Sequence, residues 1–150
     1  MFEHVLIAVD GSKNSKKAAK AGIELAKLSG GEVEIVYVAD LSKCVTSAGI
    51  TPPFGGISPD VIDSVAANLR EIGEKATLEV DDLARAEGVK SGRLIVEGNP
   101  PSEILKIAED NKMDLIVIGS IGKTGLEKFL MGSVAEKVVH NSKLPVLVVR

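Results

Sequence analysis

The sequence predicts a doubly wound α/β fold, in which helices cover both faces of a parallel sheet. Short apolar runs without alternation, at 5–9 (VLIAV), 115–118 (LIVI) and 146–149 (VLVV), are typical of strands buried on both faces. Longer segments with helical periodicity separate these runs. The length of 150 residues favours one domain, which we expect to cover residues 1–150.

We expect five strands, at 5–9, 34–38, 93–96, 115–118 and 146–149. The first helix is expected over 15–29, because apolar residues recur there at helical spacing and Gly30–Gly31 supplies a stop. The second begins at the cap Ser58, with Pro59 in its first turn, and ends at Gly88. Between the second strand and this helix, the Pro- and Gly-containing stretch 40–58 is expected to be a loop that is either functional or disordered.

The third helix is expected to start at Asn99–Pro100. Ser133 and Glu136 are predicted to form a capping box that opens the fourth helix, which ends at His140. Since strands alternate with helices, the crossovers should be right-handed and the sheet parallel, with helices on both faces in three layers.

Composition limits the possible functions. Hydrophobic residues make up 45% of the chain and aromatic residues 3%, so the core must be aliphatic, and a surface that stacks nucleobases is disfavoured. The net charge of −3 argues against nucleic-acid binding, because no basic field is available for a phosphate backbone. A small acidic ligand remains possible, since it needs only a local site.

Cysteine and histidine are scarce. The single Cys44 excludes a disulfide framework and a cysteine zinc site, and it suits a reducing compartment. His4 and His140 form no metal cluster or Ser/His/Asp arrangement with a visible partner. The first apolar run begins at Val5 without room for a signal peptide, and no run approaches the roughly 20 residues of a membrane span. We therefore expect a cytoplasmic protein that does not bind membranes.

Ligands of open parallel sheets bind beyond the carboxyl ends of the strands. Asp10 follows the first expected strand, and glycines at 119, 122, 125 and 132 lie between the fourth strand and the helix at Ser133. Glycines let the backbone approach a ligand, and a helix N-terminus offers unpaired N–H groups, so this region predicts a phosphate site. Gly122–Lys123–Thr124 resembles the end of a Walker A loop, but Val117 stands where its first Gly is required, and no G-x-G-x-x-G is present.

Gly119, Gly122, Gly132 and Ser133 follow the spacing G-2x-G-9x-G-S/T, which resembles the nucleotide-binding pattern of the universal stress protein family. Four longer segments also resemble this family, in the right order: HVLIAVDGSKNS, EVEIVYV, EGNPPSEIL and GSVAEKVVHNSKLPVLVV. The resemblance covers nearly the whole chain and is weakest over 40–58. It implies the ATP-binding subtype, a stress-response function and a Rossmann-like sheet with strand order 3-2-1-4-5.

The resemblance also implies roles for individual residues. Asp10 would hydrogen-bond the ribose, which Gly119 would approach, and the backbone of Val38 would contact adenine. The site residues that it implies, together with Ser120, which follows Gly119, are Ala8, Val9, Asp10, Val38, Gly119, Ser120, Gly122, Gly132, Ser133 and Val134. Of these, Gly122, Gly132, Ser133 and Val134 would bind the phosphates. Mg²⁺ or Mn²⁺ would bridge the phosphates. Simpler interpretations exist: Ser133 as a cap and Asp10 as a turn residue.

We expect ATP binding with slow or no hydrolysis, because no general base is evidently placed on a water. One alternative is an ATPase or a kinase that phosphorylates itself on Ser120, Thr124 or Ser133. Another is an interaction module whose glycine loop is only structural, and adenine nucleotides other than ATP also remain open. With Tyr37 inside a strand and no Trp, adenine should be held by aliphatic walls and backbone hydrogen bonds.

The apolar C-terminal segment 144–149 predicts self-association. If this strand lies at the sheet edge, its unpaired backbone groups invite a partner strand, and a two-fold dimer is the simplest result. The family resemblance also implies a homodimer through this strand.

Overall fold

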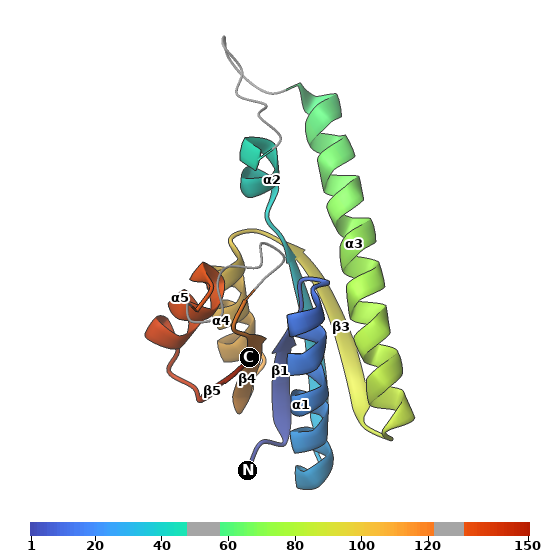
Figure 1. Ribbon diagram of the computed structural model, residues 1–150, viewed down its shortest axis with the longest axis vertical. Helices are drawn as coiled ribbons and strands as arrows, with labels where there is room; N and C mark the ends of the chain where they lie inside the picture. The colour runs from blue at the N-terminus through green and yellow to red at the C-terminus, as the bar shows by residue number, and fades with distance from the viewer. Residues whose placement is uncertain (48–57, 122–130) are drawn as a thin grey trace.

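The computed structural model describes residues 1–47, 58–121 and 131–150 (Figure 1). Its elements are, in order, β1 (His4–Ala8), α1 (Lys13–Ser29), β2 (Glu32–Ala39), α2 (Leu41–Ser47), α3 (Pro59–Ala86), β3 (Lys90–Glu97), α4 (Pro100–Asp110), β4 (Leu115–Gly119), α5 (Ser133–Asn141) and β5 (Val146–Val149). The strands form one parallel sheet with the order β3-β2-β1-β4-β5, which confirms the predicted fold class and strand order.

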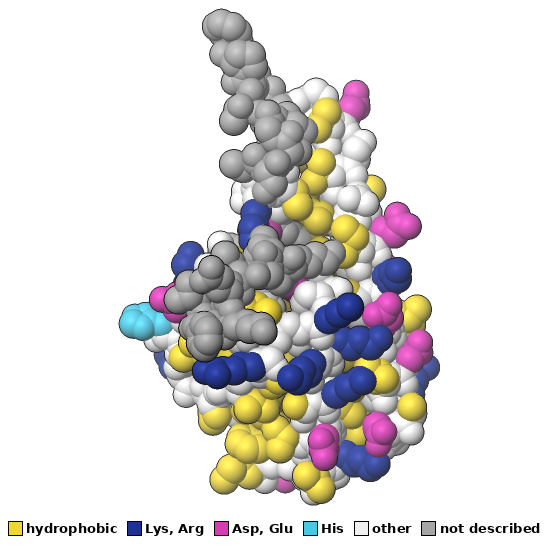
Figure 2. Space-filling view, in the orientation of Figure 1, with side chains coloured by type: hydrophobic (Ala, Val, Ile, Leu, Met, Phe, Trp, Pro, Cys, Tyr) yellow, Lys and Arg dark blue, Asp and Glu magenta, His cyan; other side chains and the backbone are white. Residues whose placement is uncertain are grey.

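Alternation along the strands builds two aliphatic cores. Val5 and Ile7 of β1 belong to the core that α1 and α3 cover, and Leu6 and Ala8 belong to the core that α4 and α5 cover. The inward face of α1 is small and apolar, as at Ala18 and Ala19 (and at Gly22, Ile23 and Ala26 further on). Its outward face is rich in lysine, and Figure 2 shows Lys and Arg side chains gathered over this helix.

The expected stop at Gly30 and the expected starts at Ser58 and Asn99 are confirmed, whereas α1 begins at Lys13, two residues before its expected start. Ser12 caps α1 by accepting from the Ser15 N–H at 3.1 Å, and Gly30 ends the helix in the left-handed conformation at φ 66°. The side chains of Ser58 and Asn99 cap α3 and α4 in the same way, each with proline in the first turn.

The expectation of a loop throughout 40–58 is wrong for its first part, because α2 occupies Leu41–Ser47. Asp40 starts this helix: its Oδ1 accepts from the Ser42 hydroxyl at 2.7 Å and from the Lys43 N–H at 3.1 Å. Figure 1 shows α2 beside the N-terminal part of α3, beyond the end of the sheet. Residues 48–57 lie outside the described part of the chain.

A polar network anchors α3 to β3. The Asp81 carboxylate is buried, accepts from the Ser91 hydroxyl of β3, and lies 3.0 Å from Arg85 Nε. One turn earlier, the buried Thr77 hydroxyl accepts from Arg93 Nη1 at 3.2 Å. These bonds fix the helix against the outer strand, so that its N-terminal half extends over the carboxyl end of the sheet.

Within the described residues, no helix combines the length and apolar character required to cross a membrane.

We expect Asp81→Ala to lower the free energy of unfolding by about 2 kcal/mol, because the Ser91 hydroxyl loses its acceptor in a largely buried place. Asp82→Ala, which alters the exposed neighbour on the same helix, should change stability by less than about 0.5 kcal/mol. Urea unfolding followed by circular dichroism measures both variants. Equal stability of the two variants would contradict the anchoring role of Asp81.

Candidate functional site

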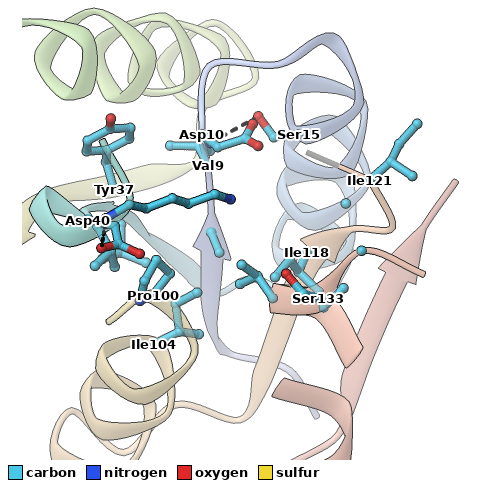
Figure 3. Close-up of a pocket in the computed structure, with 18 of the residues that line it drawn as sticks. Val9, Asp10, Ser15, Tyr37, Asp40, Pro100, Ile104, Ile118, Ile121 and Ser133 are labelled. Carbon is cyan, nitrogen blue, oxygen red and sulfur yellow. Dashed lines mark hydrogen bonds between the residues drawn. The ribbon is translucent and has the colours of Figure 1, made fainter. Parts of the chain in front are cut away.

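A pocket of about 390 Å³ opens at the carboxyl ends of the strands (Figure 3). The ends of β1, β2 and β4 form its floor, and its walls come from α2, α3, α4 and α5. Most of the lining side chains are aliphatic, as at Val36, Ile104 and Ile118. An apolar pocket of this size at this edge of a parallel sheet is the usual place for a small ligand.

The structure brings nine of the ten predicted site residues together around this pocket. They are Ala8, Val9, Asp10, Val38, Gly119, Ser120, Gly132, Ser133 and Val134. The tenth, Gly122, lies outside the described residues, as do Lys123, Thr124 and Gly125. The nine meet because β2, β1 and β4 are neighbours in the sheet and all end at the same edge. Their part in ligand binding stays a prediction.

Asp10 takes part in a turn through one carboxylate oxygen, and its other oxygen has no partner in the part of the chain that the structure describes. Its Oδ1 accepts from the Ser12 N–H at 2.9 Å, and its own N–H donates to the Ser15 hydroxyl at 3.3 Å. The turn therefore accounts for the hydrogen bond of one of the two carboxylate oxygens, Oδ1. Oδ2 has no hydrogen-bond donor among the described residues, and Asp10 lines the pocket. A ligand hydroxyl could use that oxygen without disturbing the turn.

The predicted capping box at the start of α5 is wrong by one residue. Gly132 is the cap residue, with φ −60° and ψ 153°, and Ser133 is already the first helical residue. No side chain caps this helix, because the Ser133 hydroxyl and Glu136 each lie one position too far along. The Gly132 N–H donates to the Ser120 carbonyl at 2.6 Å, which ties the start of α5 to the end of β4. The first turn of α5 thus borders the pocket, and no side chain among residues 1–47, 58–121 and 131–150 accepts from its N–H groups.

Gly119 has a structural reason that the sequence did not reveal. A Cβ at this position would overlap Oδ1 of Asn14, which lies at the start of α1. That Oδ1 accepts from the Ile121 N–H at 3.0 Å, and Nδ2 of Asn14 donates to the Val149 carbonyl at 3.3 Å. Asn14 therefore holds the ends of β4 and β5 together, and it needs glycine at 119 to approach so closely.

Part of the pocket wall was missed entirely by the sequence analysis. The pocket is also lined by Tyr37 of β2, by Asp40 between β2 and α2, by Lys43 and Cys44 of α2, and by Leu69 and Ile72 of α3. The α2 residues were missed because this helix was not predicted. Cys44, expected in a loop, lies half-buried in the wall formed by α2.

Tyr37 was expected to be an ordinary strand residue, but it also lines the pocket. Burial raises the pKa of its hydroxyl, and the nearby acidic groups of Cys44 and Asp10 raise this pKa further.

A doubly wound parallel sheet with an apolar pocket at its carboxyl edge, and a helix N-terminus at the rim, is the architecture typical of small-ligand-binding domains of the α/β class. The chain belongs to the universal stress protein family, which it matches over residues 1–150. It is 40% identical to universal stress protein MJ0531 of Methanocaldococcus jannaschii, over 100% of this chain and 83% of that protein. It is 31% identical to universal stress protein MJ0577 of the same organism, over 100% of this chain and 96% of that protein.

Solved structures agree with this membership. The structure of MJ0577 superimposes with a TM-score of 0.82 at 32% identity, over 99% of this chain and 96% of that chain. A universal stress protein in complex with cAMP has a TM-score of 0.67 at 24% identity, over 99% and 97% of the two chains. A universal stress protein of Archaeoglobus fulgidus in complex with dAMP has a TM-score of 0.66 at 23% identity, over 100% and 98%. The last two similarities are evidence for the fold.

We expect Tyr37, the only tyrosine of the chain, to ionise in the folded protein at a pH above its value of about 10 in the denatured chain. Because the folded state favours the neutral hydroxyl, the free energy of unfolding should fall as the pH rises from about 10 through the folded pKa. Tyrosinate absorbance, measured with and without denaturant, reports both values. The prediction fails if folded Tyr37 ionises no later than the denatured chain.

Proposed function

We propose that this protein binds an adenine nucleotide, specifically ATP, in the pocket at the carboxyl ends of its strands. The observation that carries the proposal is the start of α5, whose first-turn N–H groups border the pocket and have no side-chain cap within the described part of the chain. A helix N-terminus in this state is an anion site, because the N–H groups and the positive end of the helix dipole point at the ligand. Phosphate is the ligand group that suits it best.

The rest of the pocket suits a nucleoside. The free Oδ2 of Asp10 can accept from a ribose hydroxyl. Val38, Ile104 and Ile118 offer the aliphatic surface that an adenine ring needs. The proposal is supported by two universal stress proteins whose solved structures contain cAMP and dAMP, since both ligands join an adenine nucleoside to a single phosphate.

We infer that Mg²⁺ or Mn²⁺ accompanies ATP, held mainly by the phosphate oxygens. In the described ranges, no three His, Cys, Asp or Glu side chains gather into a metal site. Binding with slow or no hydrolysis is the activity we expect, so that the nucleotide acts as a regulatory ligand of a stress-response protein.

Gly132→Val should weaken ATP binding by at least about tenfold, because the added methyl groups would cover the phosphate side of the pocket. The fold should persist, since φ −60° and ψ 153° are accessible to valine. Adenosine affinity should change by less than about twofold, since no phosphate is present. Gly122→Val changes the other glycine assigned to the phosphates, and it should weaken ATP binding in the same way. Equilibrium dialysis measures these affinities, and normal ATP binding by both variants would show that the phosphate site is misplaced.

We also propose that the protein is a homodimer through β5, which is an edge strand. The carbonyls of Pro145 and Val149 accept from β4 or from the residue after it, at 3.0 and 2.8 Å. Backbone groups alternate in direction along a strand, so those of Val146 and Val148 face outward. This free edge can pair with the same edge of a second chain.

Val148→Pro should weaken the dimer at least about tenfold, because each chain loses an outward N–H donor while its bonds to β4 remain. Val148→Ala is the matched control, since it shortens the side chain but keeps the N–H. Light scattering of the wild type should give twice the 15.7 kDa mass of one chain. A wild type that is monomeric at micromolar concentration would disprove the dimer.

A further inference from the structure

The carboxylate of Asp40 lies in the pocket wall and stabilises the fold through one of its two oxygens. Asp40 is half-buried and lines the pocket where β2 ends. Its Oδ1 accepts from the Ser42 hydroxyl at 2.7 Å and from the Lys43 N–H at 3.1 Å, and these bonds start α2. Across residues 1–47, 58–121 and 131–150, no donor reaches Oδ2, and the carboxylate takes part in no ion pair. Oδ2 can therefore accept from a ligand without disturbing the cap of α2.

This second oxygen is directed into the pocket. Figure 3 shows Asp40 beside Pro100, on the side of the pocket opposite Ser133. A dashed line joins one carboxylate oxygen to the start of α2, and the other oxygen points toward the interior of the pocket. Because two hydrogen bonds to Oδ1 hold the side chain in place, Oδ2 is oriented before any ligand arrives.

The order of the strands places Asp40, Asp10 and the start of α5 in a row along the carboxyl edge of the sheet. Asp40 directly follows β2, and Asp10 lies just beyond the end of β1. The start of α5 is tied to the end of β4, because the Gly132 N–H donates to the Ser120 carbonyl. β2, β1 and β4 are neighbours in the sheet, at a spacing of about 4.8 Å. A nucleotide with its phosphates at α5 and its sugar at Asp10 would therefore extend its base toward Asp40.

We propose that Asp40 is a specificity-determining residue, whose Oδ2 accepts a hydrogen bond from the exocyclic amino group of adenine. This inference rests on the proposed function and identifies a side chain that selects the base. An ionised carboxylate can only accept hydrogen bonds, and the amino group of adenine is a donor. Hypoxanthine has a carbonyl oxygen in place of this amino group, and that oxygen would face a negative charge. The pocket should therefore prefer adenine to hypoxanthine.

The test compares wild type with Asp40→Asn in calorimetric titrations with adenosine, inosine and purine riboside, which lacks the amino group. Wild type should bind adenosine at least about tenfold more tightly than purine riboside, because only adenosine can donate to the carboxylate. In the variant, this preference should fall below about threefold. Inosine should gain relative to adenosine, because Nδ2 of the asparagine can donate to the inosine carbonyl. Thermal unfolding without ligand should be unchanged, since asparagine caps a helix as well as aspartate does.

Asp63→Asn is the matched control, because it removes the same charge from an exposed residue of α3 outside the pocket and should leave the base preference unchanged. If wild type binds purine riboside as tightly as adenosine, or if Asp40→Asn keeps the wild-type preference, the role of Asp40 is disproved and the nucleotide site stands. An equal loss of preference in Asp63→Asn would also disprove the contact, since charge alone would then explain it. If wild type binds neither ATP nor adenosine, the proposed function fails, and this inference fails with it.

Discussion

The parallel pairing of β1 with both of its neighbours is the constraint on which the rest of the structure depends. β1 pairs with β2 from His4↔Glu32 to Ala8↔Val36 and with β4 from Val5↔Leu115 onward. Because all three strands run in the same direction, the residues that follow them emerge at one edge. A shift of register by one residue would exchange the two faces of β1 and bury the wrong side chains. The aliphatic interior therefore fixes the floor of the pocket as well as the stability of the domain.

The second half of the pocket depends on a different set of contacts. Asp81 and Thr77 bind α3 to β3 through partly buried hydrogen bonds, and the 28-residue helix continues past the sheet. Its Leu69 and Ile72 then form a wall, and α2 packs beside them. The pocket is thus closed on one side by the N-terminal half of α3, while the contacts that hold this helix to β3 lie further along it, at Thr77 and Asp81. Because the two sets are separate, Asp81 and Thr77 stabilise the fold while Leu69 and Ile72 remain available to a ligand.

The sequence predicted the elements whose signals are local. Buried strands such as 115–118 are continuous apolar runs, and the caps Ser58 and Asn99 act on residues three positions away. Strand order and the site residues at the strand ends came from the family resemblance together with the rule for open sheets. What sequence reasoning missed depends on contacts between distant segments, such as Asn14 against Gly119. Helix α2 was missed because seven residues are too few for a clear periodicity, and because its cap Asp40 begins the stretch 40–58 that was expected to be a loop.

The distribution of charge in the pocket explains how an acidic chain can hold an anion in one orientation. The net charge is −3, and the described pocket wall carries the carboxylates of Asp10 and Asp40 and the ammonium of Lys43. These carboxylates repel phosphate from their part of the pocket, while the N-terminus of α5 attracts it to the other. Apolar walls exclude water and strengthen both effects. A nucleotide would therefore be oriented by the dipole of α5 together with the charged side chains of the pocket, and the net charge of the chain does not reveal this local arrangement. The sugar would then lie beside the carboxylate that can accept its hydroxyl hydrogens.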